Sequence, residues 1–322
     1  MHQQLATWQF VQQNLQQQIP VMLLYVLQSN GSSPGRQGFM MAVNIKGKMD
    51  GSLGGGIMEY KFVELAKERL LLVENKTTLH IQIHNKTAGH NQSGMICSGE
   101  QIIFIYPIKV TDILVINSIV QSMLLYQNGT LQLSNAGIVF TNQIPNTNFG
   151  FKKIVNDFLY TEKTGFKQTL CIIGGGHCAL AFAKLMYGMD FYIKLFDDRD
   201  GLNTIEQNMY VHQKNILNSY TELANTLTTD ANTYIVVMTF GYRTDDVAVR
   251  TLFNKPFAYF GLLGSKKKIE QMFTEYKNEG ISSTLLQRIH APIGIPIKSK
   301  TPQEIAISIA AQIIKVKNEL LP

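Results

Sequence analysis

Apolar residues recur along the first part of the chain at the spacings of helices and strands. Between residues 5 and 17 they stand three or four positions apart, which predicts an amphipathic helix with a core face of Leu5, Trp8, Val11 and Leu15. Residues 21–27 form an apolar run without charge, and residues 39–45 form another. Each of these runs predicts a strand.

A longer helical pattern covers residues 57–71. Its predicted core face recurs every three or four positions, at Ile57, Tyr60, Val63, Ala66 and Leu70. Downstream patterns predict two strands, a helix and a hairpin, at residues 78–83, 101–108, 111–126 and 130–141. This mixture predicts an N-terminal domain of mixed α/β type.

The last part of the chain alternates strand and helix patterns. Residues 169–173 predict a strand, residues 177–187 a helix and residues 191–196 a second strand. Apolar runs at residues 234–240 and 258–263 predict further strands, each followed by a helical pattern. Such alternation predicts a Rossmann-like parallel sheet of four or more strands with helices on both faces.

The fold class predicted is therefore α/β, with this C-terminal sheet preceded by the mixed α/β domain. Residues 142–167 combine turn formers with a short amphipathic piece, which is typical of a linker. The predicted boundaries are residues 1–150 for the N-terminal domain, 151–168 for the linker and 169–322 for the C-terminal domain.

A glycine turn joins the first predicted strand and helix of the C-terminal domain. Gly174, Gly176 and Ala179 occupy the three small positions of the G-x-G-x-x-[G/A] pattern. In that pattern the first glycine permits the turn, the second lets a pyrophosphate approach the backbone, and the third small residue lets the helix pack on the strand. Asp197, about twenty residues further on, is placed to accept hydrogen bonds from a ribose diol. The turn therefore predicts a site for a phosphate-bearing ligand, with NAD(P) as one candidate.

A second glycine run, Gly54, Gly55 and Gly56, opens the predicted helix over residues 57–71. Unpaired amide hydrogens at such a helix start can bind an anion, although a tight turn with close backbone packing accounts for the same glycines. The preceding segment, residues 29–38, is dense in turn formers and carries Arg36. It is interpreted as a surface loop or as a loop that contacts a ligand.

Three lysines stand in the first turn of a helix that Ser265 is predicted to cap. Lys266, Lys267 and Lys268 oppose the helix dipole there, so the segment is either a solvated basic face or a phosphate clamp. Cys97 lies in a polar, glycine-containing loop and is either an inert or a reactive thiol. His80 and His84 lack a third ligand nearby, so they are interpreted as surface residues rather than a metal site.

Composition narrows the class of protein. The chain has 322 residues, of which 45% are hydrophobic and 16% charged, which is ordinary for a globular protein. The net charge of +6 comes without a basic stripe interleaved with aromatics, so no nucleic-acid function is expected. Three cysteines without a CxxC pair form no disulfide framework and fit a reducing cytoplasm. No apolar run approaches the length of a membrane span, so neither export nor membrane embedding is expected.

Five segments together resemble the XdhC/CoxI family, whose members are proposed maturation factors for molybdenum hydroxylases such as xanthine dehydrogenase and carbon monoxide dehydrogenase. They follow the family's order along nearly the whole chain. The segments are GSSPGRQGFMM from Gly31, GSLGGGIMEY from Gly51, IIGGGHCALAFA from Ile172 with FDDR, FGLLGSKKK from Phe260, and HAPIGIPI from His290 with TPQEIAISIAAQI.

The resemblance implies an N-terminal XdhC-type domain and a Rossmann domain that bind the molybdenum cofactor (molybdopterin), protect it during sulfuration and deliver it to an apo molybdenum hydroxylase. A cysteine desulfurase and a second copy of the chain are further candidate partners. Catalytic residues are not assigned, since such an accessory factor need not be an enzyme. The residues carried over as cofactor-binding are Ser32, Arg36, Gly54, Gly55, Gly56, Glu59, Cys97, Gly174, Gly176, His177, Asp197, Lys266, Lys267 and His290. Cys97 is also the candidate ligand to the cofactor's molybdenum.

The chain departs from the family pattern at three positions. Ile57 replaces a frequent cysteine after the glycine run, Phe240 replaces a histidine after Thr239, and Gln312 replaces a glutamate. Two other functions remain open alongside the maturation chaperone. One is an NAD(P)-dependent oxidoreductase with His177 as proton donor, and the other is a scaffold that docks a redox partner.

Overall fold

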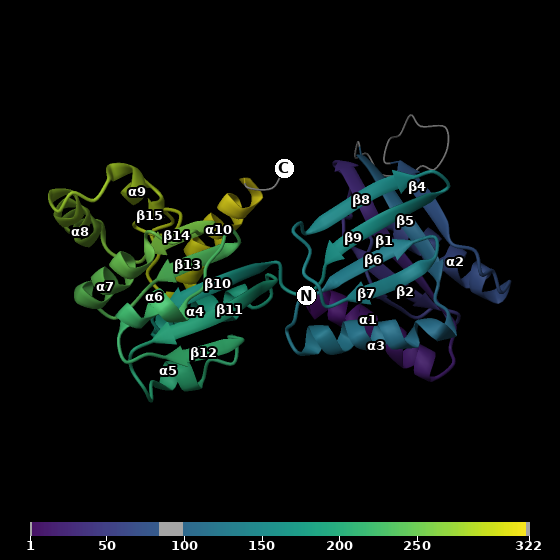
Figure 1. Cartoon of the computed structure of the whole chain (residues 1–322), viewed down its shortest axis with the longest axis horizontal. Helices are drawn as coiled ribbons and strands as arrows, with labels where there is room; N and C mark the ends of the chain where they lie inside the picture. Colours follow the sequence, from purple (N-terminus) through teal and green to yellow (C-terminus); the bar gives the residue numbers. More distant parts are fainter. Residues whose placement is uncertain (1, 84–98, 320–322) are drawn as a thin grey trace. The chain divides into compact units, whose positions relative to one another are not determined.

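The computed structural model describes residues 2–83 and 99–319, and the chain divides into two compact units (Figure 1). The N-terminal unit comprises Met1–Gly165 and the C-terminal unit Phe166–Pro322. In the described ranges no helix is both long and apolar enough to cross a bilayer.

Two antiparallel sheets build the N-terminal unit. The five-stranded sheet has the order β3-β2-β1-β5-β4, and the four-stranded sheet has the order β7-β6-β9-β8. The strands are β1 (Val21–Gly31), β2 (Met40–Asn44), β3 (Met49–Gly51), β4 (Thr78–Ile83), β5 (Gly99–Pro107), β6 (Thr130–Ser134), β7 (Gly137–Thr141), β8 (Phe149–Ile154) and β9 (Asp157–Lys163). The helices are α1 (His2–Gln16), α2 (Ile57–Leu71) and α3 (Ile113–Leu124), with a short 3₁₀ turn η1 (Val110–Asp112) before α3.

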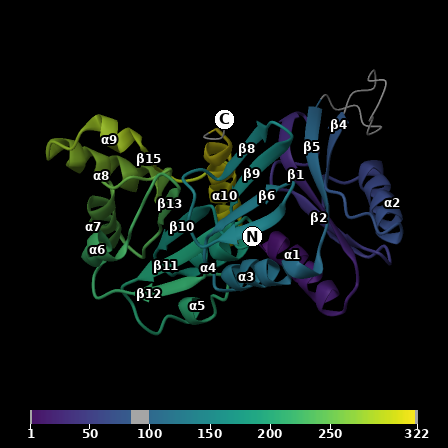
Figure 2. The same cartoon turned by 45° about the vertical axis from the view of Figure 1, so that its right-hand side comes forward.

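Strand β1 is apolar throughout its first seven residues because both of its faces are buried. Side chains alternate between the two faces of a strand. Leu23 and Tyr25 join a core shared with α1, α3 and the four-stranded sheet, whereas Met22 and Leu24 join a second core under α2. Helices α1 and α3 lie side by side over the first of these cores (Figure 2).

The predicted core face of α2 is confirmed at Ala66 and Leu70 but wrong at Ile57 and Tyr60. Ile57 and Tyr60 are each 68% exposed. The side chains that face the sheet stand four residues apart and are Met58, Phe62, Ala66 and Leu70. Apolar residues at the start of the helix allow two stripes of helical spacing that both lead to Ala66 and Leu70. Packing on the sheet selects the stripe through Met58 and Phe62.

Residues 151–168 were expected to be a linker, but most of them belong to the four-stranded sheet. Strand β9 pairs with both β8 and β6 in antiparallel register, and Thr161 lies opposite Gly150 and Gln132. The division between the two units falls between Gly165 and Phe166, which is inside the predicted linker.

The C-terminal unit is built on a six-stranded parallel sheet of order β12-β11-β10-β13-β14-β15. The strands are β10 (Gln168–Ile173), β11 (Phe191–Asp197), β12 (Gln213–Ile216), β13 (Thr233–Val237), β14 (Tyr259–Leu262) and β15 (Ile289–His290). The helices are α4 (His177–Met186), α5 (Asn203–Glu206), α6 (Leu223–Thr226), α7 (Tyr242–Leu252), α8 (Lys266–Asn278), α9 (Ser283–Gln287) and α10 (Pro302–Glu319), with a 3₁₀ turn η2 (Tyr220–Glu222).

Helices cover both faces of this sheet, as the sequence predicts. Leu170 and Ile172 of β10 share a core with α4 and α10, whereas Cys171 and Ile173 share another with α7 and α8. Numbered by their position in the sequence, the strands run 3-2-1-4-5-6, which is the order of dinucleotide-binding Rossmann folds. The predicted α/β fold class is therefore confirmed.

Candidate functional site

The candidate site of the C-terminal unit lies where the strand order reverses. Strand β10 is flanked by β11 on one side and β13 on the other, and all three run parallel. Ligands of open α/β sheets bind beyond the carboxyl ends of strands at such a reversal. The glycine turn after β10 is at this point.

Each glycine of this turn has a different environment. Gly174 has φ of +107°, and a Cβ there would lie 2.4 Å from the carbonyl oxygen of Met238. Gly176 caps α4 with φ of −74°, and a Cβ there would meet no atom within 4 Å. Gly174 is therefore required by the fold, whereas Gly176 borders open space.

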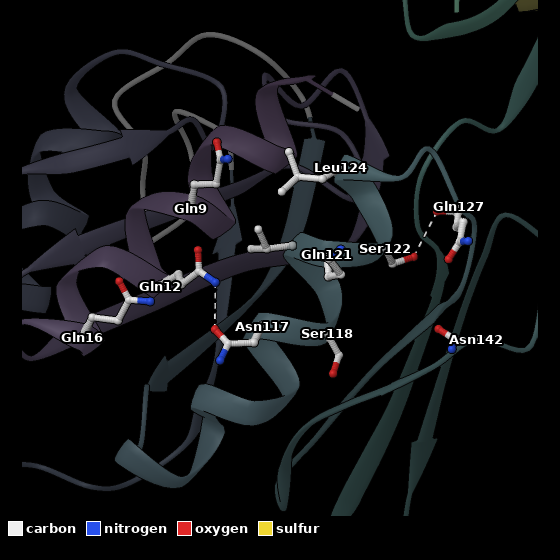
Figure 3. Close-up of a pocket in the computed structure, with 11 residues that line it drawn as sticks. Gln9, Gln12, Gln16, Asn117, Ser118, Gln121, Ser122, Leu124, Gln127 and Asn142 are labelled. Atoms are coloured by element: carbon white, nitrogen blue, oxygen red, sulfur yellow. Dashed lines mark hydrogen bonds between the residues drawn. The ribbon is translucent and has the colours of Figure 1, made fainter. Parts of the chain in front are cut away.

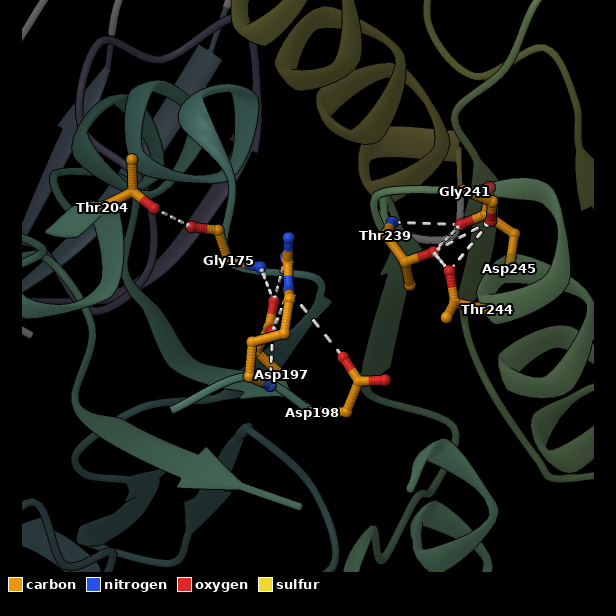
Figure 4. A network of polar contacts seen from close by, with 9 residues as sticks. Gly175, Asp197, Asp198, Thr204, Thr239, Gly241, Thr244 and Asp245 are labelled. Atoms are coloured by element: carbon orange, nitrogen blue, oxygen red, sulfur yellow. Dashed lines mark hydrogen bonds and ion pairs between the residues drawn. The ribbon is translucent and has the colours of Figure 1, made fainter. Parts of the chain in front are cut away.

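Asp197 is fully buried, and both its oxygens are occupied by the protein itself (Figure 4). Oδ2 accepts from the backbone N–H of Gly175 at 2.6 Å and from Nη2 of Arg199 at 2.8 Å. Oδ1 accepts from the backbone N–H and Nε of Arg199, both at 2.9 Å. A carboxylate offers about four acceptor positions, so Asp197 does not present the free acceptor for a ribose diol that the sequence predicts.

Arg199 bridges from Asp197 toward β13. Its hydrogen bonds to Asp197 raise the pKa of the guanidinium above its ordinary value. The guanidinium carbon lies 5.4 Å from the ring centroid of Phe240, which follows β13 and is 76% exposed. Nε of Arg199 also lies 3.9 Å from Oδ1 of Asp198. These contacts link the residues that follow the carboxyl ends of β11 and β13, beside the glycine turn.

A second buried carboxylate, Asp245, stands at the carboxyl end of β13 (Figure 4). Its Oδ1 accepts from the backbone N–H of Thr239 at 3.0 Å and from the Thr239 hydroxyl at 2.6 Å. Its Oδ2 pairs with the ammonium of Lys268. Lys268 therefore opposes the helix dipole for a structural reason, since it neutralises Asp245.

The two other lysines of this turn point outward. Lys266 is 84% exposed and lies 3.8 Å from Glu270, and Lys267 is also exposed. Both stand after β14, at the carboxyl edge of the sheet. Ser265 caps the helix by accepting from the backbone N–H of Lys268, as the sequence predicts.

The two candidate histidines are separated along this edge. His177 is the first residue of α4 and is exposed beside the glycine turn. His290 ends β15, three strands from β10, and stacks on Tyr259 with ring centroids 4.7 Å apart. Burial lowers the pKa of His290 from its ordinary value. Gln312 of α10 links β14 to the loop after β15, since its Oε1 accepts from the Tyr259 hydroxyl and from the backbone N–H of Gly294.

In the N-terminal unit, the carboxylate of Glu59 fills the second glycine loop. Its Oε1 accepts from the Ser52 hydroxyl at 2.6 Å and from the backbone N–H groups of Leu53 at 2.6 Å and Gly55 at 2.9 Å. The N–H of Gly54 donates to the Ser52 hydroxyl. The backbone N–H groups of this loop were expected to bind an anion. Those of Gly54 and Gly55 instead donate to Ser52 and Glu59 of the protein itself.

The structure brings the loop of residues 32–38 onto this glycine loop. Nε2 of Gln101 donates to the carbonyls of both Gly35 and Leu53. A Cβ on Gly35 would lie 2.0 Å from the carbonyl oxygen of Leu53, so the two segments are in direct contact. Arg36 is exposed and donates to the carbonyl of Gly31.

Ser32, Arg36, Gly54, Gly55, Gly56 and Glu59 therefore gather at one end of the five-stranded sheet. Gly99, the first residue of β5, also contacts this end, because a Cβ there would lie 2.7 Å from the backbone nitrogen of Ser33. Cys97 lies outside the described residues, so its predicted role stays a prediction. Within residues 2–83 and 99–319 no three His, Cys, Asp or Glu side chains are grouped to hold a metal.

A separate open pocket of about 630 Å³ lies between α1 and α3 of the N-terminal unit (Figure 3). Its described lining has no titratable side chain and consists mainly of amides and hydroxyls. Gln12 donates to Asn117 at 2.8 Å across the two helices. The pocket is larger than a water site, but its described lining offers no charged group.

Sequence reasoning missed the two side chains that occupy the switch point most directly. In the sequence, Arg199 stands out only as the end of FDDR, and Phe240 only as a departure from the family pattern. The Asp-x-Arg spacing at a strand end is the signal for the first, because a two-residue offset lets the guanidinium fold back onto the carboxylate. The burial of Asp245 and its pairing with Lys268 carry no local signal, since 23 residues separate them.

Comparisons with known proteins support the same division of the chain. Residues 170–313 match the XdhC Rossmann domain, and residues 14–82 match the XdhC and CoxI family. The Escherichia coli K12 protein YqeB is 25% identical over 308 residues, which are 94% of this chain and 44% of that protein. A Bacillus subtilis 168 protein named as a probable xanthine dehydrogenase subunit is 28% identical over 85 residues, which are 26% of this chain and 24% of that protein.

The chain thus spans less than half the length of these two curated relatives. A crystal structure described as a xanthine dehydrogenase from Bacillus halodurans has a TM-score of 0.71 and 18% sequence identity, and the alignment covers 98% of this chain and 97% of that one. At this identity the likeness shows the fold alone.

Proposed function

The chain belongs to the XdhC and CoxI family, and from this membership we propose that it binds the molybdenum cofactor and acts as a maturation factor for a molybdenum hydroxylase of the xanthine dehydrogenase type. In this function it protects the cofactor and delivers it to the apo-enzyme. The apo-hydroxylase is the principal partner, and a cysteine desulfurase and a second copy of the chain are further proposed partners.

The observation that carries the proposal is the open start of α4 at the switch point. Gly176 caps α4 without a side-chain hydrogen bond, and nothing lies within 4 Å of the position where its Cβ would stand. A helix N-terminus with this access to the backbone suits a phosphate, and the cofactor's pterin carries one. His177 is exposed at the same point, where its ring can contact the ligand.

The two glycine turns differ in their fit to an anion. In the N-terminal unit, Gly54 and Gly55 already donate to Ser52 and Glu59. In the C-terminal unit, Gly175 donates to Asp197, but Gly176 faces open space. We therefore assign the phosphate end of the cofactor to Gly176 and His177, and assign Glu59 the role of holding its loop in shape.

The bound cofactor would supply a dithiolene-held molybdenum centre, and the chain's own residues would bind and shield it. Cys97 remains the proposed thiol contact to the metal or its sulfur, because thiolates are soft ligands. Lys266 and Lys267 follow β14, and His290 ends β15 along the same edge of the sheet. All three are proposed to contact the cofactor's polar groups. The NAD(P)-dependent alternative lacks a free ribose acceptor at Asp197.

The test is anaerobic co-purification from a host that makes molybdenum cofactor, with molybdenum and oxidised pterin measured per chain. The proposal expects near-stoichiometric pterin in the unchanged chain and a strong loss in Gly176→Asp, whose carboxylate would repel the phosphate. Lys315→Gln, on the exposed side of α10, changes the net charge by the same amount and is the charge-matched control, which should retain pterin. Pterin absent from the unchanged chain would contradict the proposal.

A further inference from the structure

Three side chains lie close together at the carboxyl ends of β11 and β13, and they are Asp198, Arg199 and Phe240. The fold of the glycine turn does not require this grouping. Arg199 lies 3.9 Å from Asp198 and 5.4 Å from the ring of Phe240. Phe240 is 76% exposed, so the part of its ring that Arg199 does not cover is accessible to a ligand. An acceptor, a donor and an aromatic surface are thus adjacent at the switch point.

Asp197 fixes the orientation of Arg199. A guanidinium carries five N–H donors, and two of them, on Nε and Nη2, are directed to Asp197. Nη1 makes no hydrogen bond to any residue in the described ranges, and the side chain is 33% exposed. The outer edge of Arg199 is therefore available and held in place by the buried carboxylate.

The charges here decide between classes of ligand. Asp197 and Asp198 carry two negative charges against the single positive charge of Arg199. A phosphate placed beside Arg199 would also approach Asp198, whose side chain is 24% exposed. Like charges at this separation disfavour a second anion, whereas a neutral ring that donates to Asp198 is favoured.

A buried tyrosine lies beneath the cluster. Tyr220 is 2% exposed, and its hydroxyl lies near the backbone of Asp198. Burial and then the charges of Asp197 and Asp198 raise the pKa of Tyr220, so the phenol stays protonated and lies close to both carboxylates.

We propose that Asp198, Arg199 and Phe240 recognise a 2-amino-4-oxopyrimidine edge, which is the edge shared by pterin and guanine. The ring amino group and the adjacent N–H donate to the carboxylate of Asp198. The ring oxygen accepts from the outer N–H groups of Arg199, and the ring stacks on Phe240. This proposal refines the proposed function and rests on it for the identity of the cofactor. The pterin end of the cofactor would bind at these three residues, and its phosphate end would bind at Gly176.

The test measures binding of free pterin, guanosine, inosine and adenosine to the full chain by fluorescence and calorimetry. Pterin and guanosine should bind at least about tenfold more tightly than inosine, which lacks the amino group, and adenosine should bind most weakly. Asp198→Asn should remove this preference, and Phe240→Ala should weaken all four rings alike by about tenfold. Asp200→Asn, a neighbouring exposed carboxylate, is the matched control and should change nothing.

Two results would overturn the inference. One is a lack of selectivity in the unchanged chain, seen either as equal binding of guanosine and adenosine or as no binding of guanosine, adenosine or pterin. The other is a preference for the amino group that survives in a folded Asp198→Asn variant. Pterin preferred over guanosine would identify the cofactor's own ring as the ligand, and the reverse would identify a guanine dinucleotide form.

These outcomes are separate from those of the co-purification test. If the chain carries cofactor but its selectivity among rings does not depend on Asp198, the proposed function stands and this inference fails. If the chain binds free rings with a selectivity that depends on Asp198 but carries no cofactor, the inference stands and the proposed function fails.

Discussion

The carboxylate of Asp197 accepts a hydrogen bond of 2.6 Å from the backbone N–H of Gly175, which precedes it by 22 residues. The turn after β10 is therefore shaped by the acid at the end of β11. In the N-terminal unit Glu59 does the same for Gly55. In both units, an acid of the chain itself occupies part of the space that the glycine pattern leaves for an anion, so the pattern alone overstates how many amides are available to a ligand.

Asp197→Asn should destabilise the C-terminal unit by about 2–3 kcal/mol. The asparagine amide would turn a donor toward Gly175 or Arg199, both of which are donors, and the Arg199 charge would lose its nearest partner. The figure lies below that for a fully buried pair because Arg199 is a third exposed. Urea unfolding of the full chain, followed by hydrogen exchange at Gly175, measures it.

The control for this change is Asp200→Asn, because Asp200 is exposed and bonds only to the adjacent backbone N–H of Gly201 among the residues described. Its effect should stay within about 0.5 kcal/mol. Equal stabilities for the two variants would show that the Asp197 pair is not important to the fold.

Lys268→Met should destabilise the same unit far more than Lys266→Met. Lys268 neutralises a carboxylate that is fully buried at Asp245, and removing one partner of such a pair costs about 2–4 kcal/mol when the cation is partly exposed. Lys266 is 84% exposed, so its loss should change the unfolding free energy by less than about 0.5 kcal/mol. Chemical denaturation of the two variants compares these values, and similar losses would rule out the assigned role of Lys268.

The C-terminal fold could be predicted because its signals are local. The apolar run of β10, the glycine turn and α4 follow one another within twenty residues, and each has its own pattern. The four-stranded sheet could not be predicted in full, because β9 buries a charged residue where an apolar one is expected. Glu162 is fully buried, and it accepts from Tyr25, Tyr160 and Gln4, of which Tyr25 and Gln4 come from distant elements.

The candidate site divides in the same way. Sequence spacing placed Asp197 at the end of a strand near the glycine turn, and the structure agrees with that position. The spacing does not show that Arg199 folds back to fill the acceptor positions of Asp197. Side-chain competition for a donor or acceptor depends on rotamers and on neighbouring strands, so it becomes visible only in three dimensions.

The titration of His290 should lie below the ordinary histidine value of 6.5, because burial disfavours its charged form. A histidine whose pKa is lowered by folding contributes stability above pH 6.5 and loses it as the pH falls from 6.5 through the folded pKa. NMR titration of the ring gives the midpoint directly, and His290→Gln should flatten the loss of stability in this range. A midpoint at or above 6.5 would contradict the burial argument.

Gly174→Ala and Gly176→Ala should separate folding from binding at the same turn. At Gly174 a Cβ would come within 2.4 Å of the Met238 carbonyl in a backbone conformation with φ of +107°, so the variant should lose about 3 kcal/mol or more of stability. At Gly176 the φ of −74° suits alanine and no atom lies within 4 Å, so stability should change by less than about 1 kcal/mol. The added methyl would nevertheless stand where a phosphate must approach the backbone, so pterin retained on purification should fall. Thermal unfolding and pterin content measured on the same preparations test both halves. A Gly176→Ala chain that is stable and fully loaded would exclude the start of α4 as the phosphate site while leaving the fold assignment intact.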